Sequence, residues 1–330
     1  MSKPRVFVTR AIPDAGLTII TDACDADVWS EDLPPSRGIL LERIKGKVGI
    51  LSLVTDKIDA EVMDSAGGQL KIISNYAVGF DNIDVQEATK RGILVGNTPG
   101  ILTETTADLC FALLLAAARR IGEGIDYIRK NKWETFKPME LLGKDVHNST
   151  LGIVGMGRIG VEVARRAKGF NMDVVYYDYR GRGELGEAVN AKMCTTIDEL
   201  FQRADFISLH VPLTVETRHL IDAAAFTNMK DTAILINASR GPVVDSDALY
   251  DALKSKKIAY AALDVTDPEP IPFSHKLLSL PNCLIVPHVG SATIETRSKM
   301  AVMAAENLLK GIRGELPKHI VNPEALKNGL

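Results

Sequence analysis

The stretch 149–178 reads STLGIVGMGRIGVEVARRAKGFNMDVVYYD, and it decides the fold of the chain. Its apolar start predicts a β-strand, and a helical pattern and a second β-rich run follow the glycine motif GMGRIG. Gly155 permits the tight turn from strand to helix, Gly157 lets backbone N–H groups approach a pyrophosphate, and Gly160 lets the helix pack closely on the strand. The stretch therefore has every part of a dinucleotide-binding unit.

Residues after the first two glycines complete the predicted cofactor site. Arg158 and Ile159 open the helix, whose dipole and unpaired N–H groups attract phosphate charge. Asp178 follows Gly160 by 18 residues, where an acid is expected to meet the adenosine ribose hydroxyls. A glycine-rich turn alone also occurs in other α/β proteins, so the prediction depends on the strands, helix and acid occurring together.

The composition agrees with that of a soluble enzyme. With 330 residues, of which 46% are hydrophobic and 25% charged, the chain can bury a large core in two domains. A net charge of −3 indicates no surface for nucleic acid. The longest apolar run, 109–118, is far shorter than the ~20 residues of a membrane span and predicts a buried helix.

The N-terminus lacks the apolar core of a signal peptide, so we expect a cytoplasmic protein. The cysteines form no C-x-x-C pair, which indicates buried thiols in a reducing compartment and no zinc site; they are Cys24, Cys110, Cys194 and Cys283.

Strands and helices alternate in two series along the chain. Short β-rich runs lie at 5–9, 48–53, 70–74 and 93–96, and then at 152–154, 174–177, 206–211, 233–236, 259–265 and 283–286. The alternation predicts an α/β protein with two domains, one a Rossmann-type doubly wound parallel sheet and the other a smaller flavodoxin-like parallel sheet. We expect the active site in the cleft between them.

Two long helices set the expected domain boundaries. One runs from Thr103, its predicted N-cap, past Arg120 and bridges the domains. The other covers about 293–313 and returns the chain to the first domain through GELPKHIVN. The dinucleotide-binding domain is therefore expected at 101–287 and the substrate domain at 1–100 and 288–330.

Three segments at predicted strand ends carry groups suited to catalysis. In ILINASRGPVVD, Arg240 follows a strand, and its guanidinium can grip a carboxylate with two hydrogen bonds. In LDVTDPEP, Asp264 closes a strand and Glu269 stands between two prolines, whereas in CLIVPHVGSAT His288 follows a buried strand. Taken singly, these residues also fit a surface arginine, solvated turn acids and a structural histidine.

Together with SNYAVGFDNID and NTPGILTETTADL, these segments resemble the NAD(P)-dependent D-2-hydroxyacid dehydrogenase family, and within it the glyoxylate/hydroxypyruvate reductases. The resemblance extends from VFVTR to GELP. It implies that Arg240 holds the substrate carboxylate, that His288 is the acid/base and that Glu269 is its partner. It further implies substrate contacts at Leu53, Val78, Gly79 and Ser291, and cofactor contacts at Thr106, Val211, Pro212, Thr217, Ala238, Arg240, Asp264, His288 and Gly290. His210, at another strand end, is expected to line the cofactor pocket.

The implied reaction transfers a hydride from the nicotinamide to a small 2-oxo acid, glyoxylate or hydroxypyruvate, and yields glycolate or D-glycerate. Arg240 would stabilise the charge on oxygen while His288, as an imidazolium favoured by Glu269, donates the proton. The segment WETFKPMELLG resembles the family's dimer arm, so we expect a homodimer in which Trp133 or Phe136 reaches the partner's site. An ordinary aromatic packing pair is the alternative.

Other members of the fold remain possible from the sequence. An NAD-sensing corepressor shares it, although the presence of Arg240, Glu269 and His288 favours an enzyme. Phosphoglycerate-type and 2-ketogluconate-type dehydrogenases are the neighbouring activities. For the cofactor, Asp178 favours NADH because its charge would repel a 2′-phosphate, whereas Arg180 and Arg182 could bind the phosphate of NADPH.

Overall fold

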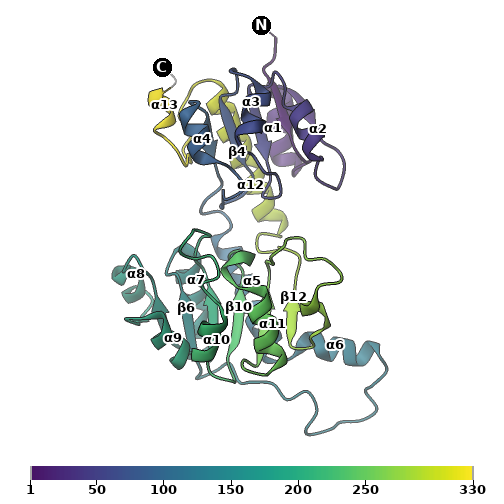
Figure 1. Cartoon of the computed structure of the whole chain (residues 1–330), viewed down its shortest axis with the longest axis vertical. Coiled ribbons are helices and arrows are strands. Elements are labelled where there is room, and N and C mark those ends of the chain that lie inside the picture. Colours follow the sequence, from purple (N-terminus) through teal and green to yellow (C-terminus); the bar gives the residue numbers. More distant parts are fainter. Residues whose placement is uncertain (1, 329–330) are drawn as a thin grey trace. The chain divides into compact units, whose positions relative to one another are not determined.

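The computed structural model describes residues 2–328 and divides the chain into two compact units (Figure 1). Unit 1 comprises Met1–Leu102 and Ala292–Leu330, and unit 2 is Thr103–Ser291. The second boundary therefore lies four residues beyond the predicted start at His288. The reason is local, because the backbone N–H of His288 donates to Asp264 O over 2.9 Å and ties the segment to unit 2.

Unit 1 contains one parallel sheet of five strands in the order β2-β1-β3-β4-β5, which is the flavodoxin-like order. Four strands were predicted, but β2 was missed. It is an edge strand of sequence DADV and no residue in it is fully buried, so it lacks the apolar run that marks the others. The strands are β1 (Arg5–Val8), β2 (Asp25–Val28), β3 (Gly49–Ser52), β4 (Ile72–Asn75) and β5 (Leu94–Gly96).

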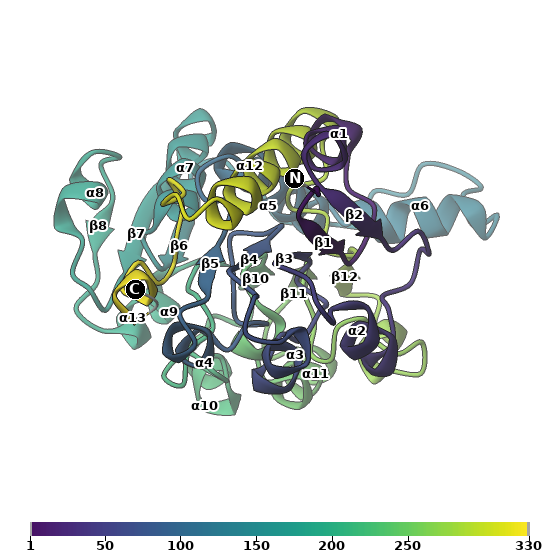
Figure 2. The same cartoon turned by 90° about the horizontal axis from the view of Figure 1, so that it is seen from above.

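Helices cover both faces of this sheet (Figure 2). Alternate residues of each strand point to opposite faces, so Val6 and Val8 pack under α1 (Asp14–Ala23) and α12 (Ile294–Ile312), and Phe7 packs on the other side. That other side is covered by α2 (Arg37–Arg43), α3 (Ala60–Ala66) and α4 (Val85–Lys90). The tail returns to unit 1 as predicted, because Val321 N donates to Val95 O over 2.8 Å. A short helix, α13 (Ala325–Asn328), follows.

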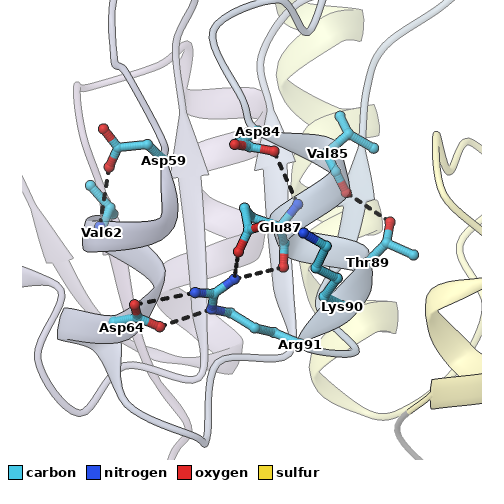
Figure 3. Close-up of polar contacts among 9 residues, drawn as sticks. All are labelled: Asp59, Val62, Asp64, Asp84, Val85, Glu87, Thr89, Lys90 and Arg91. Atoms are coloured by element: carbon cyan, nitrogen blue, oxygen red, sulfur yellow. Dashed lines mark hydrogen bonds and ion pairs between the residues drawn. The ribbon is translucent and has the colours of Figure 1, made fainter.

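An ion-pair clamp links two of the covering helices (Figure 3). Arg91 Nε lies 2.8 Å from Asp64 Oδ1 of α3, and its Nη1 donates to Glu87 of α4. The hydrogen bonds from Arg91 and Lys90 hold the pKa of Glu87 at about 2. Asp59 and Asp84 cap α3 and α4 through the N–H groups of Val62 and Glu87. Both helices are therefore fixed at their starts by caps and to one another by Arg91.

Unit 2 contains one parallel sheet of seven strands in the order β12-β11-β10-β9-β6-β7-β8. If β6 is counted as strand 1 and the sheet is followed from β8 to β11, this is the order 3-2-1-4-5-6 of a dinucleotide-binding fold. Strand β12 is added at the edge beyond β11. All six predicted strands are present, whereas the exposed two-residue edge strand β8 was missed. The strands are β6 (Thr150–Val154), β7 (Asp173–Tyr177), β8 (Lys192–Met193), β9 (Phe206–Leu209), β10 (Ile234–Asn237), β11 (Tyr260–Leu263) and β12 (Cys283–Ile285).

The single helix predicted from Thr103 is wrong in its length. It forms two helices, α5 (Thr103–Ala118) and α6 (Ile121–Arg129), because Arg120 adopts a left-handed conformation (φ 51°) that ends the hydrogen-bond ladder. Thr103 is the first helical residue rather than the cap, and α5 lies within unit 2 rather than bridging the units. As predicted, most of 109–118 is buried.

The remaining helices of unit 2 are α7 (Arg158–Ala167), α8 (Gly183–Glu187), α9 (Ile197–Arg203), α10 (Ala223–Asn228) and α11 (Ser246–Lys254), with single 3₁₀ turns at Lys168–Phe170, Gly241–Val243 and Lys276–Ser279. Helices α5 and α7 cover one face of the sheet, and α9, α10 and α11 cover the other. Across residues 2–328, no helix is both long and apolar enough to cross a membrane. The cysteine thiols are free, and Cys283 is only partly buried whereas the other three are buried.

Candidate active site

The glycine loop after β6 has the geometry that the motif predicts. Gly155 has a φ of 97°, and a Cβ there would lie 2.9 Å from the backbone oxygen of His210. A Cβ on Gly160 would lie 2.4 Å from the carbonyl oxygen of Gly155, so helix α7 packs on the strand only because this residue has no side chain. A Cβ on Gly157, the N-cap of α7, would meet only Arg182, with its Nη1 at 3.6 Å. The space beside Gly157 is therefore free of atoms other than Arg182, and a contact of its backbone with a phosphate stays a prediction.

Asp178 fastens this loop to the end of β7. Its buried carboxylate accepts the N–H of Met156 over 2.9 Å through Oδ2 and the N–H of Arg180 over 2.8 Å through Oδ1. Arg182 Nε lies 3.8 Å from Oδ2, whereas the Arg180 guanidinium lies over the ring of Tyr179, 5.2 Å from its centroid. Of the two arginines considered for a 2′-phosphate, Arg182 is therefore the one paired with the acid.

The loop after β9 begins at His210, whose ring Nε2 lies 2.8 Å from Ser208 Oγ. Burial lowers the pKa of His210 to about 4, so its ring is neutral at pH 7. Val211 is buried and Pro212 exposed, and the hydroxyl of Thr217 donates to Pro212 O over 2.6 Å. Thr217 therefore closes this loop, and the contacts of these residues to a cofactor stay a prediction.

The segments of Arg240 and Glu269 are packed against each other. A Cβ on Gly241 would lie 1.8 Å from the carbonyl oxygen of Thr266, so no other residue fits behind Arg240. The Asn237 side chain donates to Arg240 O over 2.9 Å and fixes the chain leaving β10, where Ala238 lies half-buried. The N–H of Thr266 in turn donates to Glu269 Oε2 over 3.3 Å.

His288 and Glu269 form a hydrogen-bonded pair. The His288 Nδ1 atom lies 2.6 Å from Glu269 Oε1. An ionised carboxylate only accepts, so Nδ1 is the donor and Nε2 is the nitrogen left for proton exchange. Burial of Glu269 opposes its ionisation, but the hydrogen bond and charge of His288, together with Thr266 N–H and Arg240, outweigh burial and hold the pKa of Glu269 below its usual range.

Asp264 holds the loop that carries His288. Its Oδ1 accepts the N–H of Val289 over 2.6 Å and its Oδ2 accepts that of Gly290 over 2.9 Å. Gly290 O accepts the hydroxyl of Thr106 over 3.2 Å. His288 itself has a φ of 52°, which is rare for a residue with a side chain and persists where the surroundings hold it. Burial raises the pKa of Asp264, and both backbone N–H bonds favour its charged form.

The structure thus brings the predicted residues of unit 2 to one edge of its sheet, because they follow the carboxyl ends of parallel strands. The glycine motif, Asp178, Val211, Ala238, Arg240, Asp264 and His288 all lie there. Leu53 follows β3, and Val78 and Gly79 follow β4, at the carboxyl edge of the sheet in unit 1. That these two edges face each other across a cleft stays a prediction.

Sequence reasoning missed the asparagines beneath these loops. Asn75 ends β4, Asn97 follows β5 and Asn237 ends β10, and the side chain of each donates to a loop carbonyl. Their signal was present in the motifs SNYAVG, GNTPG and INASRG, where an asparagine follows an apolar run directly or after one small residue.

Comparison with known proteins identifies the family of the chain. The family model described as D-isomer specific 2-hydroxyacid dehydrogenase, NAD binding domain, matches residues 111–290. The chain is 54% identical to the glyoxylate reductase of Korarchaeum cryptofilum, with 98% of each chain covered. A solved protein from Thermus thermophilus has 46% identity and a TM-score of 0.89 over 96% of this chain and 99% of that one. An NADPH-dependent glyoxylate/hydroxypyruvate reductase from Sinorhizobium meliloti, solved with NADP and malonate, has 30% identity and a TM-score of 0.84 over 98% of each chain. The chain belongs to the D-isomer specific 2-hydroxyacid dehydrogenase family and is an NAD(P)-dependent oxidoreductase.

Proposed function

We propose that this enzyme reduces glyoxylate and hydroxypyruvate to glycolate and D-glycerate with NAD(P)H. The observation that carries the proposal is the 2.6 Å contact between His288 and Glu269, at the same sheet edge as Arg240 and the glycine loop. This arrangement supplies a proton donor, its charged partner and a cation for a carboxylate. The names of the relatives agree with this substrate class.

The residues divide the chemistry among them. The nicotinamide, when bound, supplies the hydride. Arg240 binds the substrate carboxylate and stabilises the negative charge that develops on the carbonyl oxygen. His288 donates a proton to that oxygen from Nε2, while Glu269 holds Nδ1 and favours the imidazolium. Asp264 keeps the His288 loop in place through Val289 and Gly290.

For substrate size, we propose that Leu53, Val78, Gly79 and Ser291 leave a small pocket around the acceptor carbon, in which Arg240 sets the carboxylate. A pocket distinguishes substrates that differ by one methylene by only ~1–3 kcal/mol, so discrimination should be graded. Branched 2-oxo acids should therefore react more slowly than hydroxypyruvate, without being excluded.

We propose a homodimer built on α6 and the segment after it, in a protein of the cytoplasm. Ile125 and Ile128 of α6 are exposed, and Trp133, Phe136 and Met139 have 67%, 84% and 81% of their surface exposed. Figure 1 shows this segment looping away from the sheet of unit 2. Large apolar side chains exposed at several positions of one segment favour an interaction surface there. Sedimentation of the unchanged protein and of Phe136→Glu tests it, and a monomer in both would contradict the dimer.

Initial rates with glyoxylate, hydroxypyruvate, pyruvate and 2-ketogluconate, each with NADH and NADPH, test the proposed substrate. We expect the first two to give the highest kcat/KM. A preference for 2-ketogluconate would identify the neighbouring activity, and binding of NADH without turnover of any of the four would indicate a sensor. Faster reaction of 2-oxoisocaproate than of hydroxypyruvate would contradict the small pocket.

A further inference from the structure

In the loop after β4 of unit 1, three consecutive carbonyl groups accept hydrogen bonds from other parts of the unit. Ala77 O accepts the N–H of Thr98, Val78 O accepts Asn97 Nδ2 and Gly79 O accepts Asn75 Nδ2, each over 2.8 Å. The donors come from the ends of β4 and β5. The carbonyl groups of Ala77, Val78 and Gly79 are therefore fixed in direction.

Fixing a carbonyl also fixes the next N–H. In a trans peptide the C=O of one residue and the N–H of the following residue point in opposite directions within one plane. The bond to Ala77 O therefore directs the N–H of Val78, and the bond from Asn97 to Val78 O directs the N–H of Gly79. Within residues 2–328, neither N–H has a hydrogen-bond acceptor. The loop thus presents two neighbouring N–H donors, each pointing away from the bonded carbonyl of its own peptide.

The asparagines are themselves held in place. Asn75 is fully buried, and its Oδ1 accepts Ser52 Oγ over 3.0 Å while its Nδ2 holds Gly79 O. Asn82 donates to Leu53 O over 3.0 Å and to Asn75 Oδ1 over 3.3 Å, so the loop after β3 belongs to the same network. Asn307 of α12 donates to Asn97 O over 2.9 Å. Neither Asn75 nor Asn97 can move without breaking several hydrogen bonds.

We propose that Asn75 and Asn97 are positioning residues, which aim the N–H groups of Val78 and Gly79 at the substrate carboxylate. The inference rests on the proposed function, in which these two residues line the substrate pocket. Backbone N–H groups make strong, charge-assisted hydrogen bonds to a carboxylate, and donors that are already oriented bind it without rearrangement. The asparagines act only through the loop.

The test compares Asn97→Leu, which keeps the size but removes the donor, with the milder Asn75→Ser. The loop binds the carboxylate equally well before and during hydride transfer. Weakening this contact should therefore raise KM and leave kcat unchanged. We expect the KM for glyoxylate and the inhibition constant of oxamate, a 2-oxo acid analogue, to rise on the order of tenfold, since one hydrogen bond to a charged group is weakened. The KM for NADH should stay within about twofold, because unit 2 is unchanged.

Asn322→Ser is the matched control. Asn322 is a buried asparagine of unit 1 that accepts the N–H of Val95 over 2.8 Å and donates to Ile93 O over 2.9 Å. In the described part of the chain, no hydrogen bond joins it to the loop after β4. The Asn322→Ser substitution should lower the melting temperature without changing the KM for glyoxylate or the inhibition constant of oxamate. The proposal would be overturned if Asn97→Leu left the KM for glyoxylate and the oxamate inhibition constant unchanged. It would also be overturned if Asn322→Ser raised these two constants equally. Failure of the unchanged enzyme to reduce any 2-oxo acid would instead overturn the proposed function, and oxamate binding to its NADH complex, followed by calorimetry, would still test the loop.

Discussion

Glu269 Oε1 and His288 Nδ1 lie 2.6 Å apart although the two residues leave different strands, β11 and β12. The packing of Gly241 against Thr266 holds the first loop, and the bonds from Val289 and Gly290 to Asp264 hold the second. The pair is thus placed by the backbone on both sides, and its chemistry can be tested by changing charge without changing shape.

Glu269→Gln should shift the pH profile of reduction. The pKa of Glu269 is held below its usual range, so the carboxylate is charged at neutral pH and favours the imidazolium that reduction needs. Without that charge, the alkaline limit of kcat/KM for reduction should move down by about one pH unit, and oxidation should become possible at lower pH. The control is Glu324→Gln, a change at an exposed residue of unit 1. Identical profiles in Glu269→Gln and the unchanged enzyme would show that the pair does not set the proton transfer.

His288→Ala should remove the proton donor and lower kcat/KM for glyoxylate by roughly 10²- to 10⁴-fold, the usual share of a positioned acid/base. The dissociation constant of NADH, measured by fluorescence, should change little because the glycine loop is intact. His147→Ala, at an exposed position after α6, serves as control. Near-normal turnover in His288→Ala would place the acid elsewhere.

Gly160→Ala should damage the cofactor unit, since the added Cβ would lie 2.4 Å from Gly155 O. Overpacking of this kind costs about 1–3 kcal/mol, and displacement of the loop should also weaken NADH binding. Gly169→Ala is the matched control, because nothing lies within 4 Å of its added Cβ. Thermal melting and NADH titration of both variants measure the difference, and equal behaviour would refute the packing role of Gly160.

We expect NADH to be preferred over NADPH because Asp178 is a carboxylate that would repel a 2′-phosphate. Arg182, with its Nε 3.8 Å from Asp178 Oδ2, moderates that repulsion. Arg182→Ala should therefore lower kcat/KM with NADPH more than with NADH, whereas Arg180→Ala, whose guanidinium lies over Tyr179, should change the ratio less. A higher kcat/KM with NADPH in the unchanged enzyme would reverse the expected preference.

The sequence by itself determined the two parallel sheets, the cofactor unit and the identity of the chemical groups. These follow from local signals: apolar runs of strand length, the spacing of Gly155, Gly157 and Gly160, and polar residues directly after strands. Local signals failed at the edges of the sheets and at a break within a helix. The edge strands β2 and β8 are too exposed to carry an apolar run, and the left-handed Arg120 divided a helix that the periodicity continued.

Only the tertiary structure decided how the loops are held. The bonds of Asp264 to Val289 and Gly290, and of Asn97 to Val78, join residues that are distant in sequence. A residue's type indicates that it can donate or accept, but not which backbone group it will meet. That choice depends on strand order, because neighbouring strands bring their ends, and the loops that follow them, within hydrogen-bond distance.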